Sequence, residues 1–595
     1  MAYRSPVADI LFSLQHVGGF EGALESGQLG DLDWATAQSI IAEAGKFAQE
    51  KIAPLNRIGD KHGARYENGA VATAPGFRDA YQDWALAGWA GVTAPADYGG
   101  MALPFQVNAA CFELWAGASM SFALCPLLSE GAVHALEAYG APELRQTYLP
   151  KLIAGQWTGT MNLTEPQSGS DLSGLKTRAE RHADGSYRLT GQKIFITYGE
   201  HDMVENIVHL VLARLPGAPE GTRGISLFLA PKFLPKADGS PGERNDIRCA
   251  GIEHKLGIHA SPTCTMIYGD NGGAKAWLVG EENRGLAAMF VMMNNARLGV
   301  GLQGVAIGER ALQQALAYAR ERRQGASGAA RGAMSPIIEH PDVHRMLLTM
   351  KALVQAARGI CHLTAAAIDG AFHGADPQAK AAAGERAALL TPVAKAFSTD
   401  IGDEAASLGV QVHGGMGFIE ETGAAQFMRD SRIAAIYEGA NGIQALDLAQ
   451  RKLGLSKGET MAREIASMRA TLAELDVAGD EFGATAVRLR EAVDALERAG
   501  RYLLAKAGGE PRVVQGAATP FLRLFGLALG GICLARAGLA AQRLVRAGDS
   551  ANQGRIALAR FFAENLAPAT SGLLQTICAG GAALASYELA LAEPA

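Results

Sequence analysis

A single acid, Glu438, has surroundings that could support chemistry. It lies in a glycine-bounded apolar turn, Ile436-Tyr-Glu-Gly-Ala-Asn-Gly-Ile-Gln444. A carboxylate in such a turn is either neutralised in a salt bridge, for which Arg432 is a candidate partner, or held free as a general base. The pKa of a free carboxyl group rises when a substrate excludes water, which suits proton abstraction near neutral pH. The turn by itself supports both interpretations equally.

Two further stretches could bind a flat, polar ligand. The first, Met161-Asn-Leu-Thr-Glu-Pro-Gln-Ser-Gly-Ser-Asp171, is a turn-rich loop that offers hydroxyl and N–H groups. The second, Lys193-Ile-Phe-Ile-Thr-Tyr198, alternates so that Phe195 and Thr197 share one face of a strand, where an aromatic plane beside a hydroxyl suits a heterocycle. Taken alone, each is more often structural: a plain turn, and an amphipathic strand with a half-buried Phe.

A glycine triplet suggests a different cofactor and is rejected. Gly299, Gly301 and Gly304 spell GxGxxG, and Glu321 follows at nearly the distance of a ribose-binding acid. This fingerprint binds a dinucleotide only when it follows a strand and opens a helix, because the pyrophosphate sits at the helix N-terminus. The sequence has a helical pattern on both sides of the triplet. We therefore expect the glycines to permit close packing between helices.

The composition excludes several classes of protein. The 595 residues carry a formal net charge of −6 with Lys and Arg scattered, so no basic stripe exists for a nucleic-acid backbone. The seven cysteines are widely spaced without a CxxC pair, which favours reduced thiols and a cytoplasmic location. Residues 1–20 lack the continuous apolar core of a secretory signal. The most apolar stretch, 524–535, is too short for a bilayer that needs about 20 helical residues.

The elements that must position these residues fall into four parts. We expect an N-terminal helical domain at 1–157, a β-domain at 158–280, a second helical domain at 281–460 and a C-terminal helical extension at 461–595. The fold class is therefore mainly α with a central β-domain. The helical segments expected from the pattern are 34–51, 142–152, 286–324, 344–373, 385–412, 460–475 and 485–507, and the strands are 187–189, 193–197, 207–214 and 224–229.

Together, the motifs resemble those of the acyl-CoA dehydrogenase family. In order along the chain they are TEPQSGSD, KIFIT, HKLGIHASPTC, QVHGGMGF, MRD and IYEGANGIQ. The resemblance covers residues 35 to 455 or so and implies a helix, β-barrel, helix architecture that holds FAD between the β-domain and the second helical domain. The chain length and the helical tail are similar to those of longer bacterial members, including the 3-methylmercaptopropionyl-CoA dehydrogenases.

The resemblance assigns a role to each motif. Glu438 matches the base that removes the α-proton of an acyl-CoA thioester while the β-hydride passes to flavin N5, which yields the trans-2-enoyl-CoA. The backbone N–H of Glu438 and a ribityl hydroxyl of FAD would stabilise the charge that develops on the thioester oxygen. The expected FAD-binding residues are Met161, Leu163, Thr164, Ser170, Phe195, Thr197, Arg322, Gln411, Gly415, Ala440 and Gly442. The expected substrate-binding residues are Ser170, Asn294, Arg297 and Gly439, and no metal is expected.

The resemblance also implies partners. Arg322, Gln411 and Gly415 match positions that reach the FAD of a neighbouring subunit, so a homodimer or a dimer of dimers is expected. Electrons would leave to an electron-transferring flavoprotein. We expect no nucleic-acid partner and no membrane association. Arg297, which matches an arginine near the coenzyme A nucleotide, could equally serve in a buried ion pair.

Two positions depart from the family pattern, and one alternative function remains. Ala440 stands where the family usually has Thr, which removes one hydroxyl from the flavin phosphate region, and Asn294 replaces a common Asp. The alternative is a flavin-containing binding or DNA-protection protein with the same fold and little turnover. That function would need a basic surface in 461–595, where acidic residues interleave with the arginines. The length of the acyl chain is left open.

Overall fold

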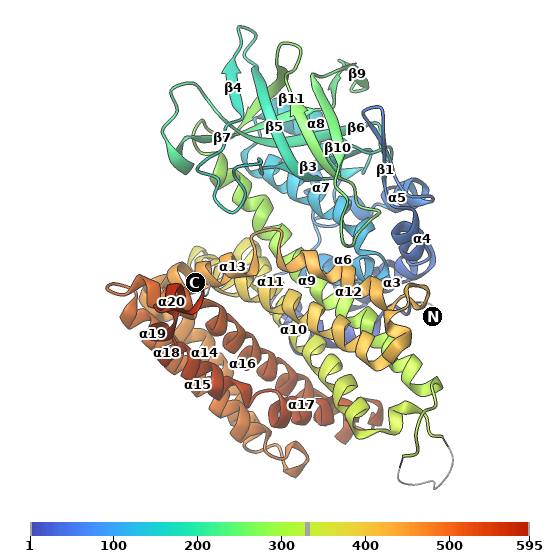
Figure 1. Ribbon diagram of the computed structural model, residues 1–595, viewed down its shortest axis with the longest axis vertical. Helices are drawn as coiled ribbons and strands as arrows, with labels where there is room; N and C mark the ends of the chain where they lie inside the picture. Colours follow the sequence, from blue (N-terminus) through green and yellow to red (C-terminus); the bar gives the residue numbers. More distant parts are fainter. Residues whose placement is uncertain (1–2, 328–333, 593–595) are drawn as a thin grey trace.

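The computed structural model describes residues 3–327 and 334–592. Figure 1 shows the β-domain at one end of the molecule and the helices gathered at the other. The fold is mainly α with a central β-domain, as the sequence predicts. Its α-helices are α1 (Val7–His16), α2 (Phe20–Glu25), α3 (Trp34–Phe47), α4 (Leu55–His62), α5 (Phe77–Leu86), α6 (Phe105–Ala118), α7 (Met120–Tyr139), α8 (Pro142–Ile153), α9 (Gly285–Glu321), α10 (Pro341–His373), α11 (Pro377–His413), α12 (Ala424–Ser431), α13 (Asn441–Asp447), α14 (Glu459–Leu475), α15 (Thr485–Lys506), α16 (Pro511–Arg546), α17 (Gln553–Asn565), α18 (Ala569–Ala579), α19 (Gly581–Leu584) and α20 (Tyr587–Ala590).

The strands form a main sheet and two small hairpins. The hairpins pair β1 (Arg65–Glu67) with β2 (Ala70–Ala72) and β8 (Phe233–Pro235) with β9 (Pro241–Arg244). The main sheet contains β3 (Trp157–Asn162), β4 (Arg178–Arg181), β5 (Tyr187–Thr197), β6 (Asn206–Arg214), β7 (Ile225–Pro231), β10 (Ile247–Ile252), β11 (Thr263–Tyr268) and β12 (Ala274–Val279). Its order is β10-β11-β5-β12-β7-β6-β3, and β4 pairs with both β5 and β6. Strands β5, β12, β7, β6 and β4 therefore close into a ring.

Alternating side chains of β6 join two different cores. Val208, Leu210 and Leu212 pack with residues of α7, α8 and α9, whereas Val211 and Ala213 pack inside the β-domain. Successive residues of a strand point to opposite faces, so a strand that is covered on both sides is apolar throughout. The two runs 187–189 and 193–197, which we expected as separate strands, are parts of β5.

The glycine triplet lies inside α9 and serves helix packing. A Cβ atom on Gly301 would lie 2.5 Å from the carbonyl oxygen of Ala394, and one on Gly304 would lie 2.2 Å from that of Ser398. Only glycine permits this approach of α9 to α11. The interpretation of the triplet as a packing feature is therefore confirmed.

The apolar stretch 524–535 belongs to a longer helix than we expected. Helix α16 has 36 residues and, by length and composition alone, could cross a membrane. Within its most apolar window, however, 94% of the residues are buried in the protein. Gly526 packs on Phe397 of α11, and Cys533 packs on Gly359 of α10. In the described part of the chain, α16 is thus the central helix of the C-terminal extension and packs against the second helical region.

Candidate active site

Glu438 lies in a backbone turn that two side-chain amides and a tyrosine hold in place. The turn precedes α13, and both Glu438 and Gly439 have left-handed φ values, 55° and 81°. The amide nitrogen of Gln444 donates to the carbonyl oxygens of Glu438 at 3.1 Å and Gly439 at 3.2 Å. Tyr437 donates its hydroxyl to Gln303 on α9 at 2.5 Å. A left-handed non-glycine residue costs about 1–3 kcal/mol and persists only where its surroundings enforce it.

The carboxylate of Glu438 has cations near it but no contact partner. In residues 3–327 and 334–592 it makes no hydrogen bond and no ion pair within 4.0 Å. Arg432 pairs instead with Asp403 at 3.1 Å, so the salt-bridge interpretation with Arg432 is wrong. Burial raises the pKa of Glu438 to about 7, and the charges of Arg297 and Lys395 partly oppose that rise. A half-buried carboxyl group with such a pKa suits a general base at neutral pH.

A buried lysine lies behind the turn, and the sequence analysis missed it. Lys395 of α11 has no exposed surface and donates to the side-chain oxygen of Asn441 at 2.8 Å. Burial lowers the pKa of Lys395 to about 8, while Glu438 and Asp400 favour its charged form. Asn441 in turn donates to Asp400 at 2.7 Å and Thr399 at 2.9 Å. The sequence signal that could have identified Lys395 is a lysine within the largely apolar run of residues 389–397.

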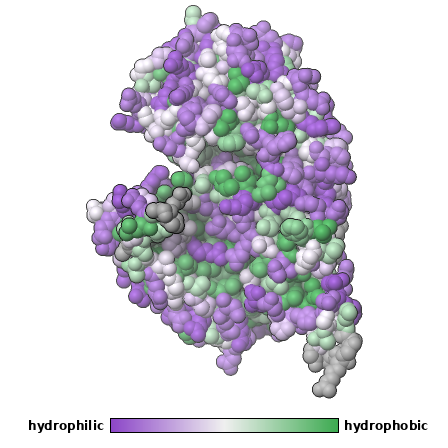
Figure 2. Space-filling view, viewed as in Figure 1, coloured by the Kyte–Doolittle hydropathy of each residue, from purple (hydrophilic) through white to green (hydrophobic). Residues whose placement is uncertain are grey.

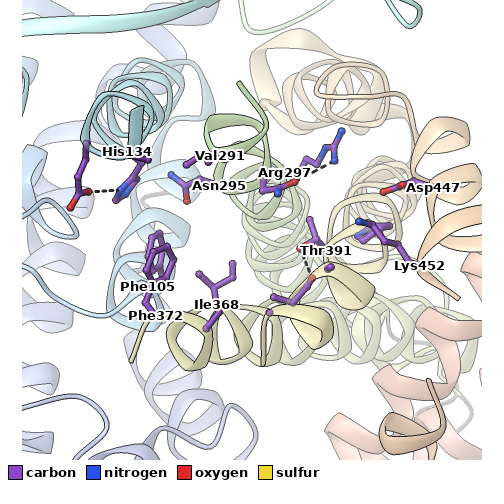
Figure 3. A pocket seen from close by; sticks show the side chains of 18 residues that line it. Phe105, His134, Val291, Asn295, Arg297, Ile368, Phe372, Thr391, Asp447 and Lys452 are labelled. Carbon is purple, nitrogen blue, oxygen red and sulfur yellow. Dashed lines mark hydrogen bonds and ion pairs between the residues drawn. The ribbon is translucent and has the colours of Figure 1, made fainter. Parts of the chain in front are cut away.

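A cavity of about 560 Å³ opens beside Arg297. Figure 3 shows Arg297 between two aromatic residues, Phe105 and Phe372, on one side and two charged residues, Asp447 and Lys452, on the other. The two aromatic rings are stacked with centroids 5.5 Å apart. The cavity therefore has an aromatic end, where the ring of His134 lies 5.3 Å from that of Phe105, and a charged end at Asp447 and Lys452. Its lining residues come from α6, α7, α9, α10, α11, α13 and the short turn that follows α13.

Two of the expected residues line this cavity, and two more lie next to Arg297. Asn294 and Arg297 line it, and Arg297 donates to Asn294 at 3.4 Å. A Cβ atom on Gly439 would lie 3.8 Å from a guanidinium nitrogen of Arg297. Glu438, next in the chain, is one of the two acids that favour the charged form of Arg297, and Asp447 is the other. Asn294 and Arg297 thus line the cavity, and Glu438 and Gly439 lie next to Arg297.

A second group of expected residues meets on the β-domain. Met161 lies in β3 and is buried, and Leu163 and Thr164 follow it. The N–H of Ile194 donates to Thr164 at 2.9 Å, which joins the loop to β5 near Phe195 and Thr197. Phe195 has a left-handed φ of 61°, and its ring is 58% exposed. An aromatic ring held outside the core beside a hydroxyl fits the isoalloxazine of FAD.

The remaining expected residues lie elsewhere. Ser170 is exposed in the loop after β3, and Ala440 and Gly442 flank the start of α13 near Glu438. Arg322, Gln411 and Gly415 are exposed at the far ends of α9 and α11. Since 25 residues of α9 separate Arg297 from Arg322, the two lie about 37 Å apart along the helix. The structure does not bring these three residues to Glu438 of the same chain.

Figure 2 shows the molecule hollowed between the β-domain and the helices, with apolar side chains along part of the hollow. Metal binding has no support there: the described residues contain no group of three or more His, Cys, Asp or Glu side chains that could hold an ion. The site offers instead an aromatic and hydroxyl surface on one side, and an unpaired acid beside a cavity on the other. These are the features of a site for a planar cofactor and an acidic C–H substrate.

Known families cover nearly the whole chain. Residues 35–156, 160–271 and 283–453 match the acyl-CoA dehydrogenase N-terminal, middle and C-terminal domains, and 464–588 match a domain described as acetyl-CoA dehydrogenase C-terminal like. The chain is 48% identical over 570 residues to 3-methylmercaptopropionyl-CoA dehydrogenase of Ruegeria pomeroyi, which covers 95% of this chain and 96% of that one.

Two solved structures share the fold. One is ACDH-11 of Caenorhabditis elegans in complex with C11-CoA, with a TM-score of 0.76, 19% identity, and coverage of 94% of this chain and 91% of that one. The other is an acyl-CoA dehydrogenase of Bacillus anthracis complexed with FAD, with a TM-score of 0.75, 22% identity, and coverage of 95% and 94%. From these matches and the site, the chain belongs to the acyl-CoA dehydrogenase family, whose members are FAD-dependent oxidoreductases of acyl-CoA thioesters.

Proposed function

We propose that Glu438 is the base that removes the α-proton of the acyl-CoA. The observation that carries this assignment is its half-buried carboxylate, which has no contact partner in the described chain and has a pKa of about 7. A paired carboxylate would have to break its ion pair before it could accept a proton. Glu438 needs no such step, because Arg297 and Lys395 act on it only at longer range.

The chain also supplies a donor for the thioester oxygen. Within residues 3–327 and 334–592, the backbone N–H of Glu438 donates no hydrogen bond. It is therefore free to stabilise the charge that develops on the thioester carbonyl as the proton leaves. The left-handed turn fixes this N–H and the Glu438 side chain on one rigid unit, so base and donor keep their relative position.

The FAD site that we propose lies against the β-domain. When bound, FAD accepts the hydride from the β-carbon of the substrate. Met161, Leu163 and Thr164 would line the ring, and Phe195 and Thr197 would cover it. Ser170, Ala440 and Gly442 would lie toward the phosphates, and Ser170 would also contact the substrate. Orientation of the ring and exclusion of water are the contributions of these protein groups.

The cavity beside Arg297 is the proposed acyl-CoA site. Arg297 and Lys452 provide positive charge for an anionic coenzyme, and Phe105 and Phe372 provide apolar surface. Because 48% identity links the chain to a 3-methylmercaptopropionyl-CoA dehydrogenase, we propose a short thioether acyl group as the preferred substrate. A thioether sulfur packs favourably against aromatic rings.

The first experiment separates the base from the cofactor. Under anaerobic conditions, an acyl-CoA should bleach the flavin of the wild-type protein, and Glu438→Gln should bind FAD but bleach at least about 10³-fold more slowly. Glu459→Gln, an exposed acid on α14, is the matched control and should bleach at the wild-type rate. Rapid bleaching of Glu438→Gln would place the base elsewhere.

The second experiment tests the substrate with an isosteric pair. 3-Methylmercaptopropionyl-CoA and pentanoyl-CoA differ by one sulfur in place of one methylene, so size is held constant. We expect a kcat/KM at least several-fold higher for the thioether, and a decline from pentanoyl-CoA to longer straight chains. An optimum at a long straight chain would exclude a thioether preference.

A second copy of the chain is the proposed occupant of the surface around Gly415. Met416, Phe418, Ile419 and Met428 are large apolar residues exposed there, with Phe418 86% exposed. Arg322 and Gln411 lie at the same helix ends, where Tyr318 of α9 stacks on His413 of α11. A homodimer would thus contribute these residues to the partner's FAD. The change Phe418→Asp should shift the sedimentation of the protein toward the monomer; an unshifted dimer would refute this surface.

We further propose a cytoplasmic enzyme that passes electrons to an electron-transferring flavoprotein, and we propose the divisions 1–157, 158–280, 281–460 and 461–595 as its domains.

The DNA-protection alternative lacks support in the C-terminal extension. Many of its arginines are paired with acids, as in Arg488 with Glu491, Arg490 with Asp476 and Arg501 with Glu497. Paired charges do not make the basic surface that DNA requires.

A further inference from the structure

Lys395 is the buried cation that lies behind the catalytic turn without a contact ion pair. Its side chain has no exposed surface, yet its ammonium donates only to the neutral oxygen of Asn441 among the described residues. A buried ammonium without an acid is costly, so an anion must compensate its charge at longer range. Glu438 and Asp400 are the two acids that favour the charged form of Lys395.

Among the residues that the structure describes, the other buried lysine shows what a purely structural arrangement looks like. Lys193 has no exposed surface either, but it lies 2.9 Å from a carboxylate oxygen of Glu165. Lys395 makes no such ion-pair contact with Glu438 in the described chain. It acts on that carboxylate only at longer range, which leaves the carboxylate free to accept a proton.

Asn441 holds Lys395 in this place. Its amide nitrogen donates to the carbonyl oxygen of Ala396 at 3.2 Å, to Thr399 at 2.9 Å and to Asp400 at 2.7 Å. These bonds fix which way the amide faces, so its oxygen must point to the ammonium of Lys395. Asn441 is also the first residue of α13 and follows Glu438 by three positions. The same side chain therefore ties both the turn and the lysine to α11.

We propose that Lys395, held by Asn441, is a positioning residue that keeps Glu438 ionised beside the substrate. This inference rests on the proposed role of Glu438 as base. The cation opposes the effect of burial on Glu438, so the base is available at a lower pH than burial alone would allow. Lys395 itself touches neither substrate nor FAD in this proposal.

Other charges also face these two groups. Arg297 approaches Glu438 from α9 and is the larger of its two cationic influences. The charges that act on Lys395 are those of Glu438 in the turn, Asp400 on the same helix and Arg297 on α9. Asp447 and Arg451, in and just after α13, act on Arg297, and the charge of Glu438 acts on the hydroxyl of Tyr437. Of these groups, Asp400 also responds to Lys395, whose charge lowers the pKa of Asp400, so a direct titration of Glu438 is needed beside the rate profile.

The test measures the pH dependence of kcat/KM for the holoenzyme with an acyl-CoA. In the wild type, kcat/KM should rise with pH through a pKa near 7. In Lys395→Met this acid limb should move up by about one pH unit, so the rate should fall about ten-fold at pH 6.5 and by less than about two-fold at pH 9. Lys506→Met, which removes a surface lysine of α15, is the charge-matched control and should leave the limb in place.

A second variant guards against misfolding. Lys395→Gln removes the charge but keeps a side-chain donor for the oxygen of Asn441, so it should shift the acid limb in the same direction. An equal loss of rate at all pH values, or an unmoved limb in both variants, would overturn the proposal. Infrared titration of the substrate-free holoenzyme, taken as the difference from Glu438→Gln, reports the Glu438 carboxyl directly. Its pKa should rise in both variants even if another residue proves to be the base, so the two proposals can fail separately.

Discussion

Two glutamates of this chain, Glu165 buried and Glu438 half-buried, have opposite properties, and the comparison shows how a fold separates structure from chemistry. Glu165, in the loop after β3, accepts from Lys193 at 2.9 Å, Thr177 Oγ1 at 2.6 Å and the N–H of Lys176 at 2.7 Å. Burial alone would raise its pKa, but these contacts outweigh burial and lower it to about 2. Glu438 lacks such contacts in the described chain, and its pKa rises to about 7. The difference is one of partners, since burial acts in the same direction on both.

The largest effect should come from Glu438→Gln. If Glu438 is the base, kcat for an acyl-CoA should fall by about 10³-fold or more, because a positioned general base contributes about 10²–10⁴-fold and no neighbouring carboxylate can replace it. The thermal unfolding temperature should not fall, since the wild-type carboxylate has no contact to lose. Steady-state kinetics and a melting curve on the same preparation test this pair of outcomes. A large loss of stability would make Glu438 a structural acid like Glu165.

Glu165→Gln should give the opposite result. It leaves the ammonium of Lys193 buried without its acid, which costs about 3–5 kcal/mol. Urea unfolding should show this loss, and Lys193→Met in the same chain should recover part of it. Activity per folded, FAD-loaded molecule should stay near the wild-type value. If turnover per flavin fell as far as in Glu438→Gln, the division of roles between the two acids would be wrong.

The two acids should also affect stability in opposite pH ranges. The folded pKa of Glu438 is raised, so its ionisation destabilises the fold as pH rises from about 4.5 through about 7. The folded pKa of Glu165 is lowered, so its stabilising contribution is present above about 4.5 and is lost as pH falls toward about 2. Relative to wild type, Glu438→Gln should therefore gain on the order of 1 kcal/mol between pH 5 and pH 8. Urea unfolding at the two pH values measures this gain, and an equal difference at both would contradict it.

The smallest expected effect concerns the FAD site near Glu438. Ala440 directly precedes α13, two positions after Glu438, at the place where a hydroxyl is common in the family. Ala440→Thr would restore a hydrogen bond to the flavin phosphate region worth about 1 kcal/mol, so FAD release on dilution should slow by about five-fold. Flavin fluorescence follows the release. An unchanged release rate would mean that position 440 does not reach the phosphates.

The sequence predicted the fold class and the segments with strong periodicity. Helices α9, α10 and α11 begin and end within eight residues of the expected limits, because long apolar stripes and few breakers define them. The apolar run 524–535 is bounded by Arg523 and Arg536, yet α16 extends well beyond it on both sides. Both arginines remain inside the helix: Arg523 pairs with Glu404 of α11, and Arg536 donates to Ser467 of α14. A charge at the edge of an apolar run ends the run but not the helix.

The part of the site that escaped prediction is the part made by long-range contacts. Glu438 was identified from its local turn, but its charge neighbours lie 141 and 43 positions away, at Arg297 and Lys395. The choice between a salt bridge and a free base depended on where Arg432 points, and it points to Asp403. No local pattern contains that information, because it depends on how α11 packs against the turn.

The packing of Gly526 on Phe397 also affects how this protein unfolds. One continuous apolar core runs from α1 through α10 and α11 to α17, whereas the interior of the β-domain forms a separate cluster. Melting of the extension would expose the back of the helix that carries Lys395, so the helical parts should unfold together in one cooperative calorimetric transition. The tail beyond residue 460 is thus no detachable module, and a chain shortened there would be expected to aggregate through the bared face of α11.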